Sequence, residues 1–413
     1  MDQKPTNGFA YLTHQHTPIP AQYKQRPEDF IVTEIPLEQP ADTGNYLYLF
    51  VQKTKRLTSD ITRILAEHFS VPRSAVGYAG LKDKHAIARQ WFSIENATET
   101  RAVEFKDDHI QIIDIRRHHE KLQRGKLTGN HFQIKLRGIG PEKLIPITQI
   151  INQLAKSGAP NFIGEQRFGY RQDNHLLGRD LVLNNTQQFL DRFLGNPLDS
   201  EPALNQAART AYQNKDYDRA LHLWPTVHRF ERQALGPLSR GAPPQDAANG
   251  IDLTHRTFLI SAFQSHIFNQ LLDQRLRSNT LNTLQPGDVA MQHADRNLIE
   301  IDQPAQHQSQ ADSIQLSPTG PMWGHAMKQA KHEIAQQELN ALQQTNVTTQ
   351  HLADCPDMLE GSRRPLRMPI TDPQTRAGAD EHGPYVELRF QLPRGSYATV
   401  LLREIIKPTT IEN

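Results

Sequence analysis

The sequence predicts an α+β fold in which strands from both ends of the chain build one mixed sheet. Segments with strand periodicity lie before residue 140 and after residue 384, and the longest segments with helical spacing lie between them. This order is typical of a sheet domain that is interrupted by an inserted domain. The expected parts are an N-terminal arm at 1–20, a discontinuous sheet domain at 21–156 and 361–413, and an inserted helix-rich α+β domain at 157–360.

The first strands and the first helix are predicted from the spacing of their apolar side chains. The segment PEDFIVTEIPL places Phe30 and Val32 on one face of a strand, because side chains alternate across a strand. Residues 46–51, YLYLFV, predict a second strand. A helix follows, with Thr58 or Ser59 as its cap. Its apolar face is expected to hold Ile61, Ile64, Leu65, His68 and Phe69.

The next elements surround a charged loop that contains glycine. Extended pieces at 75–78 and 90–94 flank this loop. Residues 131–137, HFQIKLR, alternate cleanly and predict a half-buried strand. Apolar spacing of three and four residues predicts helices at 144–154 and 257–276.

Two middle segments lack such a pattern, and the chain ends with a further strand. Residues 236–250 are rich in Pro and Gly and predict a loop. Residues 292–313 are rich in Gln, His and Asp and carry no helical stripe. Residues 385–392, YVELRFQL, predict a strand, after which we expect a turn and then a strand or a helix.

Composition excludes several classes of protein. The 46 basic and 45 acidic residues of the 413-residue chain nearly cancel, so any electrostatic bias must be local. A single cysteine, Cys355, excludes an internal disulfide and a Cys-based zinc cluster. No apolar run is long enough to cross a membrane. We therefore expect a cytoplasmic protein with no membrane association, no metal and no evident obligate protein partner.

The segment GYAGLKDKHA holds a candidate catalytic carboxylate. Asp83 lies between Lys82 and Lys84, and nearby positive charge favours the ionised form of a carboxylate. An ionised carboxylate is available as a nucleophile or a base. A Lys-Asp-Lys loop is more often solvated surface than a site, so the spacing alone does not assign a function.

Six blocks along the chain resemble the TruD family, the tRNA pseudouridine synthases that act at uridine 13. The resemblance extends from about Lys24 to Ile405 and is patchy between Tyr170 and Arg363. The blocks are KQRPEDFIVTE, GYAGLKDKHAIARQWF, RGKLTGNHFQIKLR, GAPNFIGEQRFG, SAFQSHIFNQLLDQRL and FQLPRGSYATVLLREI. The resemblance implies a pseudouridine synthase sheet domain with an inserted TRUD domain.

The resemblance also implies a reaction and its central residue. It places the family's catalytic aspartate on Asp83 and a candidate counter-ion on Lys24. The family's reaction breaks the bond from N1 to C1′ of uridine, turns the uracil and rejoins it through C5 without a cofactor. Two mechanisms stay open, because Asp83 could attack C1′ or remove the C2′ proton.

Four further residues are implied in binding the extruded nucleotide. The matching positions are Asn130 and Phe132 in the GNHF block, Phe30 in PEDF, and Tyr397, where some members carry Phe. The aromatic rings would stack on the flipped base. Without the resemblance, Phe30 and Phe132 would be taken as core residues, and Gly129–Asn130 as the turn of a hairpin.

RNA binding requires local positive charge, and one stretch provides it. Residues 116–126, RRHHEKLQRGK, hold five basic side chains and one acidic one and lead into the GNHF block. The segment GSRRPLR at 361–367 is a second candidate for phosphate contacts.

These observations predict a tRNA pseudouridine synthase that acts at position 13, in tRNA(Glu) by resemblance. The alternative is a non-catalytic RNA-binding or tRNA-folding protein with the same basic surface. A glycoside hydrolase is less favoured, because the sequence fixes no second carboxylate beside Asp83.

Overall fold

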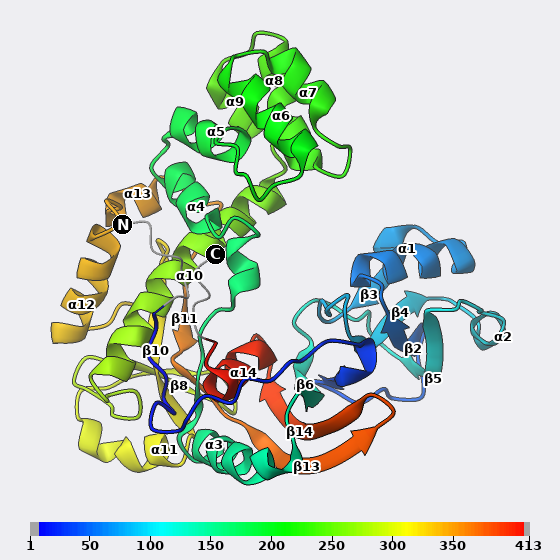
Figure 1. The fold of residues 1–413 in the computed structure, drawn as a ribbon, viewed down its shortest axis with the longest axis vertical. Coiled ribbons are helices and arrows are strands. Elements are labelled where there is room, and N and C mark those ends of the chain that lie inside the picture. Colours follow the sequence, from blue (N-terminus) through cyan, green and yellow to red (C-terminus); the bar gives the residue numbers. More distant parts are fainter. Residues whose placement is uncertain (1–7, 409–413) are drawn as a thin grey trace. The chain divides into compact units, whose positions relative to one another are not determined.

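The computed structural model describes residues 8–408 and divides the chain into two compact units (Figure 1). One, here called the sheet unit, comprises Tyr11–Asn161 and residues 367–408. The other, the inserted unit, comprises Phe162–Leu366 together with residues 8–10. The predicted α+β class with a mixed sheet is confirmed. The domain limits expected from the sequence stay a prediction, and residues 1–7 and 409–413 of the expected parts lie outside the described residues.

The sheet unit is built on one large sheet with the strand order β13-β14-β6-β1-β4-β2-β5, and β3 pairs with β4. Among the described strands of this sheet, β1 and β4 pair in parallel and the other neighbours pair antiparallel. The C-terminal strand β14 pairs with β6, and β13 lies at the edge of the sheet beside β14, which brings strands from the two ends of the chain into one sheet (Figure 1). The strands are β1 (Phe30–Pro36), β2 (Tyr46–Thr54), β3 (Val76–Tyr78), β4 (Ile87–Glu95), β5 (Ile110–His118), β6 (Leu127–Arg137), β13 (Thr371–Asp380) and β14 (Gly383–Pro393).

The register of the central strands aligns the predicted site residues. Val32 of β1 and Phe390 of β14 both pair with Phe132 of β6, and Glu34 pairs with Asn130 two residues further along β1 and β6. Asn130 therefore lies within β6, and the hairpin-turn alternative for Gly129–Asn130 is wrong. A side chain at Gly129 would meet the carbonyl oxygen of Leu392, because a Cβ there would lie 2.3 Å from it.

Helices and short segments complete the sheet unit. They are η1 (Pro27–Asp29), α1 (Thr58–Phe69), η2 (Arg73–Ala75), α2 (Glu99–Val103), η3 (Pro141–Lys143), α3 (Leu144–Ser157) and α14 (Ala398–Ile406), with the short pair β7 (Ala159–Pro160) and β12 (Arg367–Met368). The segment left open as strand or helix is thus a helix, α14. Part of the expected arm is packed into this unit, because Thr13 is buried and its backbone N donates to Glu404 Oε2 at 3.0 Å.

Helix α1 has the predicted apolar face but a different N-terminus. Ile61, Leu65 and Phe69 are buried, as their spacing predicts. The helix begins at Thr58, whose hydroxyl donates to Gln90 Oε1 at 3.1 Å and accepts from the backbone N of Lys82 at 3.1 Å. Thr58 therefore does not cap the helix but anchors the loop before Asp83.

The inserted unit is helix-rich and contains a four-stranded sheet with the order β11-β10-β8-β9. Its helical segments are η4 (Glu165–Phe168), α4 (Asn174–Val182), α5 (Thr186–Leu194), α6 (Ala203–Gln213), α7 (Tyr217–Leu223), α8 (Arg229–Ser239), α9 (Pro244–Asn249), α10 (Leu253–Arg277), η5 (Pro304–Gln306), α11 (Gln308–Asp312), α12 (His332–Gln343) and α13 (Thr349–Ala353). Its strands are β8 (Val289–Gln292), β9 (Leu298–Glu300), β10 (Leu316–Met322) and β11 (Ser362–Pro365).

The prediction of a loop at 236–250 is wrong, because helices α8 and α9 occupy most of these residues. Pro244 is at the first position of α9, where the missing N–H of proline costs little. Leu238 and Ala247 are buried in the same core cluster. Tertiary burial of these apolar side chains thus outweighs the Pro/Gly content that favoured a loop.

Two histidines of the inserted unit make its stability depend on pH. The rings of His175 and His266 stack at 4.4 Å, and burial lowers the pKa of His175 to about 3 and that of His266 to about 4. An unfolded histidine binds its proton near pH 6.5, so below this pH the unfolded state binds more protons than the folded one. The free energy of unfolding should therefore fall by roughly 3 kcal/mol or more from pH 7 to pH 4.5.

Urea unfolding of the inserted unit at both pH values would measure this loss. His266→Phe keeps a ring but cannot be protonated, so the loss should be smaller in this variant. An identical loss in wild type and variant would show that the stacked pair does not cause it.

Candidate active site

Asp83 lies on the turn between β3 and β4 and forms an ion pair with Lys24. The distance from Lys24 Nζ to Asp83 Oδ2 is 2.5 Å. The Asp83 side chain is 36% exposed and that of Lys24 only 17%, so the carboxylate stays accessible to a ligand. The predicted counter-ion and the predicted catalytic carboxylate are therefore in direct contact.

The backbone at Lys24 is held in an unusual conformation. Its φ angle is +59°, in the left-handed region that residues other than glycine seldom adopt. The preceding chain is anchored to the sheet, since Gln22 and Arg137 exchange backbone hydrogen bonds of 2.9 and 2.8 Å. This conformation directs Lys24 Nζ both to Asp83 and over the ring of Phe30, 4.2 Å from the ring centroid.

Lys53, at the end of β2, holds the backbone of the Asp83 turn from inside. Its buried Nζ donates to the carbonyl oxygen of Asp83 at 2.8 Å and to that of Arg56 at 2.7 Å. Burial lowers the pKa of Lys53 to about 8, and the nearby Asp83 carboxylate opposes this shift. The turn is thus fixed by a lysine that is distant in sequence.

The Lys82 side chain contacts Glu34 and Asn130 and not the carboxylate of its neighbour Asp83. Its Nζ lies 3.2 Å from Glu34 Oε2 and donates a short hydrogen bond to Asn130 Oδ1. Burial lowers the pKa of Lys82 and raises that of Glu34, and the attraction between the two opposes both shifts. The ion pair of the Asp83 carboxylate is thus with Lys24 and not with the neighbouring Lys82, and Lys84 is exposed.

Three phenylalanines lie next to this polar group. The rings of Phe30 and Phe132 meet edge to face at 6.0 Å, and Phe132 stacks on Phe390 at 5.5 Å. All three are buried in the sheet unit. Tyr397 is half-buried at the start of α14, after a turn that is tied to β6 by the hydrogen bond from Arg394 N to Thr128 O.

The structure thus brings five of the six predicted site residues into one contact network. Lys24 joins Asp83 to Phe30, Phe30 contacts Phe132, and Lys82 links the Asp83 turn to Asn130. Tyr397 lies in the same unit on a separate element.

Sequence reasoning missed the roles of Glu34 and Lys53, although the strand periodicity contains a signal. Glu34 follows Phe30 and Val32 on the buried face of β1. Lys53 follows Leu47, Leu49 and Val51 in the same way on β2. A charged residue on an apolar strand face must find a partner, and such residues therefore mark candidate sites.

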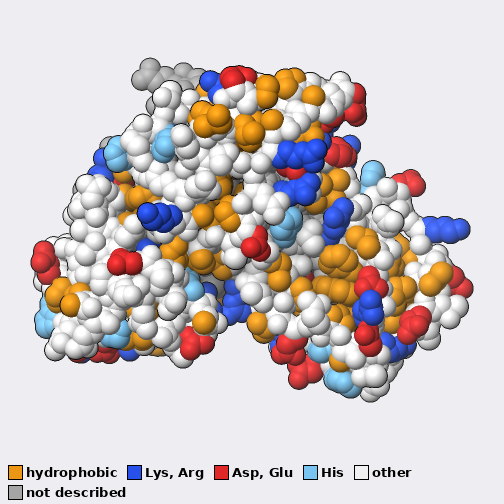
Figure 2. Space-filling model, turned by 90° about the horizontal axis from the view of Figure 1, so that it is seen from below, with side chains coloured by type: hydrophobic (Ala, Val, Ile, Leu, Met, Phe, Trp, Pro, Cys, Tyr) orange, Lys and Arg blue, Asp and Glu red, His pale blue; other side chains and the backbone are white. Residues whose placement is uncertain are grey.

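Three of the five basic side chains in the stretch 116–126 form ion pairs, whereas Lys121 and Arg124 donate to the carbonyl oxygen of Ser74 and the hydroxyl of Tyr78. Arg116 pairs with Asp42 and Asp114, Arg117 with Glu99, and Lys126 with Glu120. On the face drawn in Figure 2, basic side chains lie singly or in small groups among acidic and apolar ones.

Two of the three arginines in the second candidate segment for phosphate contacts are paired internally. Arg363 is buried and forms an ion pair of 2.7 Å with Glu338, and Arg367 is buried and donates to the carbonyl oxygen of Ser157 at 3.0 Å. These two arginines of the 361–367 segment are thus unavailable to RNA.

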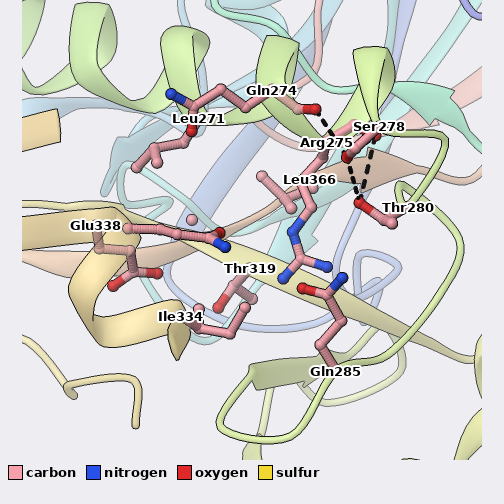
Figure 3. A pocket seen from close by; sticks show the side chains of 12 residues that line it. Leu271, Gln274, Arg275, Ser278, Thr280, Gln285, Thr319, Ile334, Glu338 and Leu366 are labelled. Atoms are coloured by element: carbon pink, nitrogen blue, oxygen red, sulfur yellow. Dashed lines mark hydrogen bonds between the residues drawn. The ribbon is translucent and has the colours of Figure 1, made fainter. Parts of the chain in front are cut away.

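A cavity of about 370 Å³ in the inserted unit does not present an accessible charged group as the Asp83 site does (Figure 3). Its charged lining residues are already paired, Arg275 with Asp288 and Glu338 with Arg363. Within residues 8–408, no three His, Cys, Asp or Glu side chains gather in a way that could hold a metal ion. In the same range, no helix has the length and apolar content to cross a bilayer.

Comparison with known proteins gives one consistent result. A family model described as tRNA pseudouridine synthase D (TruD) matches residues 6–405. The tRNA pseudouridine synthase D of Syntrophotalea carbinolica is 33% identical over 399 residues, which are 96% of this chain and 98% of that protein. The protein of the same name from Geobacter metallireducens is 34% identical over 387 residues, or 93% and 94% of the two chains.

A solved structure agrees with these relatives. The crystal structure of the putative tRNA pseudouridine synthase D (TruD) from Methanosarcina mazei superposes with a TM-score of 0.80. The two chains are 26% identical, and the match covers 97% of this chain and 96% of the other.

Proposed function

The chain belongs to the TruD family of tRNA pseudouridine synthases, and from this membership we propose that Asp83 is its catalytic group. The family's reaction is the isomerisation of uridine to pseudouridine in tRNA, so the chain is an isomerase. The observation that supports Asp83 is its accessible carboxylate, which is paired with Lys24 while Lys53 holds its backbone. A turn that is held in place and presents an accessible carboxylate is what a positioned nucleophile or base requires.

The proposed reaction needs one carboxylate and a flipped nucleotide. The bond from N1 to C1′ breaks, the uracil turns, C5 bonds to C1′, the C5 proton leaves and N1 takes up a proton. Asp83 acts in one of two ways. It attacks C1′ and is displaced again when C5 bonds to C1′, or it removes the C2′ proton and returns it to C2′ when C5 bonds to C1′. No redox change occurs, so we propose that the reaction proceeds without a cofactor.

The substrate-binding residues are proposed from the same network. Asn130 hydrogen-bonds the extruded nucleotide, and Lys24 balances the charge of Asp83. Phe30 and Phe132 form the apolar floor beneath these groups, and Tyr397 provides a further aromatic face. We propose that the target is position 13 of tRNA(Glu) and that the enzyme acts in the cytoplasm.

Tritium release from tRNA labelled at uridine C5 tests this proposal. The purified chain, dialysed against EDTA and given no small molecule, should release tritium from a tRNA(Glu) transcript. A transcript with cytidine at position 13 should release none. Release from the second transcript would overturn the position, and no release from any tRNA would overturn the catalytic function.

A further inference from the structure

We propose that Lys82 and Glu34 are positioning residues that orient the Asn130 amide so that its Nδ2 amino group faces the substrate. This inference rests on the proposed function, because it concerns how Asn130 meets the flipped nucleotide. It assigns a role to a buried pair that does not itself contact the reacting atoms.

The orientation of the amide follows from the chemistry of its partner. A lysine ammonium has three donors and no acceptor, so the Asn130 atom that it contacts must be Oδ1. Turning the amide would bring Nδ2 against the ammonium and leave two donors facing each other. In a buried site this loses a charge-assisted hydrogen bond, which is among the stronger ones in proteins.

Glu34 holds Lys82 in place, and its carboxylate favours the charged form of the lysine against the effect of burial. The Lys82 side chain is 4% exposed and the Glu34 side chain 1%, with 3.2 Å between Nζ and Oε2. The other oxygen of Glu34 accepts from the backbone N of Trp91 at 3.3 Å. Removing either partner would leave an uncompensated charge in a buried site, so the two groups act as a unit.

As a consequence, Asn130 presents hydrogen-bond donors and not an acceptor to the substrate. Asn130 Nδ2 makes no hydrogen bond within the described part of the chain, and the residue is half-buried at the end of the network. Asn130 therefore offers donors, and its ligand on the nucleotide is an oxygen acceptor, either a uracil carbonyl or a ribose oxygen. The turn that carries Asp83 also carries Lys82, so one short segment sets both the catalytic carboxylate and the donor.

A double-mutant cycle tests this coupling by steady-state tritium release from tRNA. Lys82→Met should lower kcat/KM about tenfold or more, because the amide is then free to turn. In the Asn130→Ala background the same substitution should change kcat/KM less than twofold, since no amide remains to be positioned. A purely structural role of Lys82 would lower both backgrounds by the same factor.

The controls separate the possible failures. Lys135 lies on β6, the strand that carries Asn130, and forms an ion pair with Asp380 on β13. Lys135→Met removes this ion pair and should leave kcat/KM within twofold of wild type. Thermal unfolding shows whether each variant is folded, and Glu34→Gln replaces Lys82→Met in the cycle if the latter does not fold. Absence of tritium release by wild type would refute the proposed function, whereas independent losses in an active enzyme would refute only the positioning role.

A separate variant tests whether Asn130 donates a hydrogen bond to the substrate. Asn130→Asp keeps the shape but places an acceptor where the proposal requires a donor, so its loss should equal or exceed that of Asn130→Ala. Retention of more than half of the wild-type kcat/KM by Asn130→Asp would overturn the assignment.

Discussion

Asp83→Asn is expected to abolish tritium release from labelled tRNA, with a loss of roughly 10⁴-fold or more in kcat, the scale seen when a catalytic nucleophile is removed. The amide has nearly the shape of the carboxylate but can neither attack C1′ nor accept the C2′ proton. Lys53 bonds the backbone of residue 83, not its side chain, so the turn should keep its conformation. Affinity for tRNA, measured by filter binding, should stay within a few-fold of wild type.

Asp108→Asn provides a matched control for this result. Asp108 is exposed in the same unit, and the same chemical change there should leave the rate unaltered. An Asp83→Asn enzyme that retains a tenth of the wild-type turnover would show that another group carries out the reaction. Loss of tRNA binding together with turnover would instead indicate a damaged fold.

The elements around this site could be predicted from sequence wherever one strand face or helix face is buried. The alternation of Phe132, Ile134 and Leu136 correctly predicted β6, since all three side chains are buried. The spacing of Ile61, Leu65 and Phe69 predicted α1 for the same reason. These signals are local, because they depend only on how side chains alternate along one element.

The partners of charged side chains could not be predicted in this way, because they depend on which strands become neighbours. Lys82 precedes Asp83 in the chain, yet it pairs with Glu34, which the parallel pairing of β1 and β4 brings close. Two of the basic residues at 116–126, Arg116 and Arg117, pair with Asp42 and Glu99 from other segments, and these partners could not be identified from the stretch itself. Sequence reasoning thus found the residue types of the site but not its network.

Phe132→Ala is expected to destabilise the sheet unit by about 3–5 kcal/mol, the usual cost of truncating a buried phenylalanine. Phe132 is only 6% exposed and lies between Phe30 and Phe390, so the substitution leaves a cavity beside the Asp83 network. The melting temperature of this unit should fall by roughly 10 °C. Circular dichroism during heating would measure the change.

Phe132→Leu separates the role of the ring in packing from its proposed role beneath the nucleotide. Leucine fills most of the volume, so the stability loss should be clearly smaller than for alanine. Leucine has no aromatic face, however, and a base stacked on the ring would lose ~1–3 kcal/mol of interaction. We therefore expect the folded Phe132→Leu enzyme to lose turnover more than tRNA affinity. An unchanged rate in this variant would assign the ring to the core alone and leave Phe30 and Tyr397 as the remaining candidates for stacking on the base.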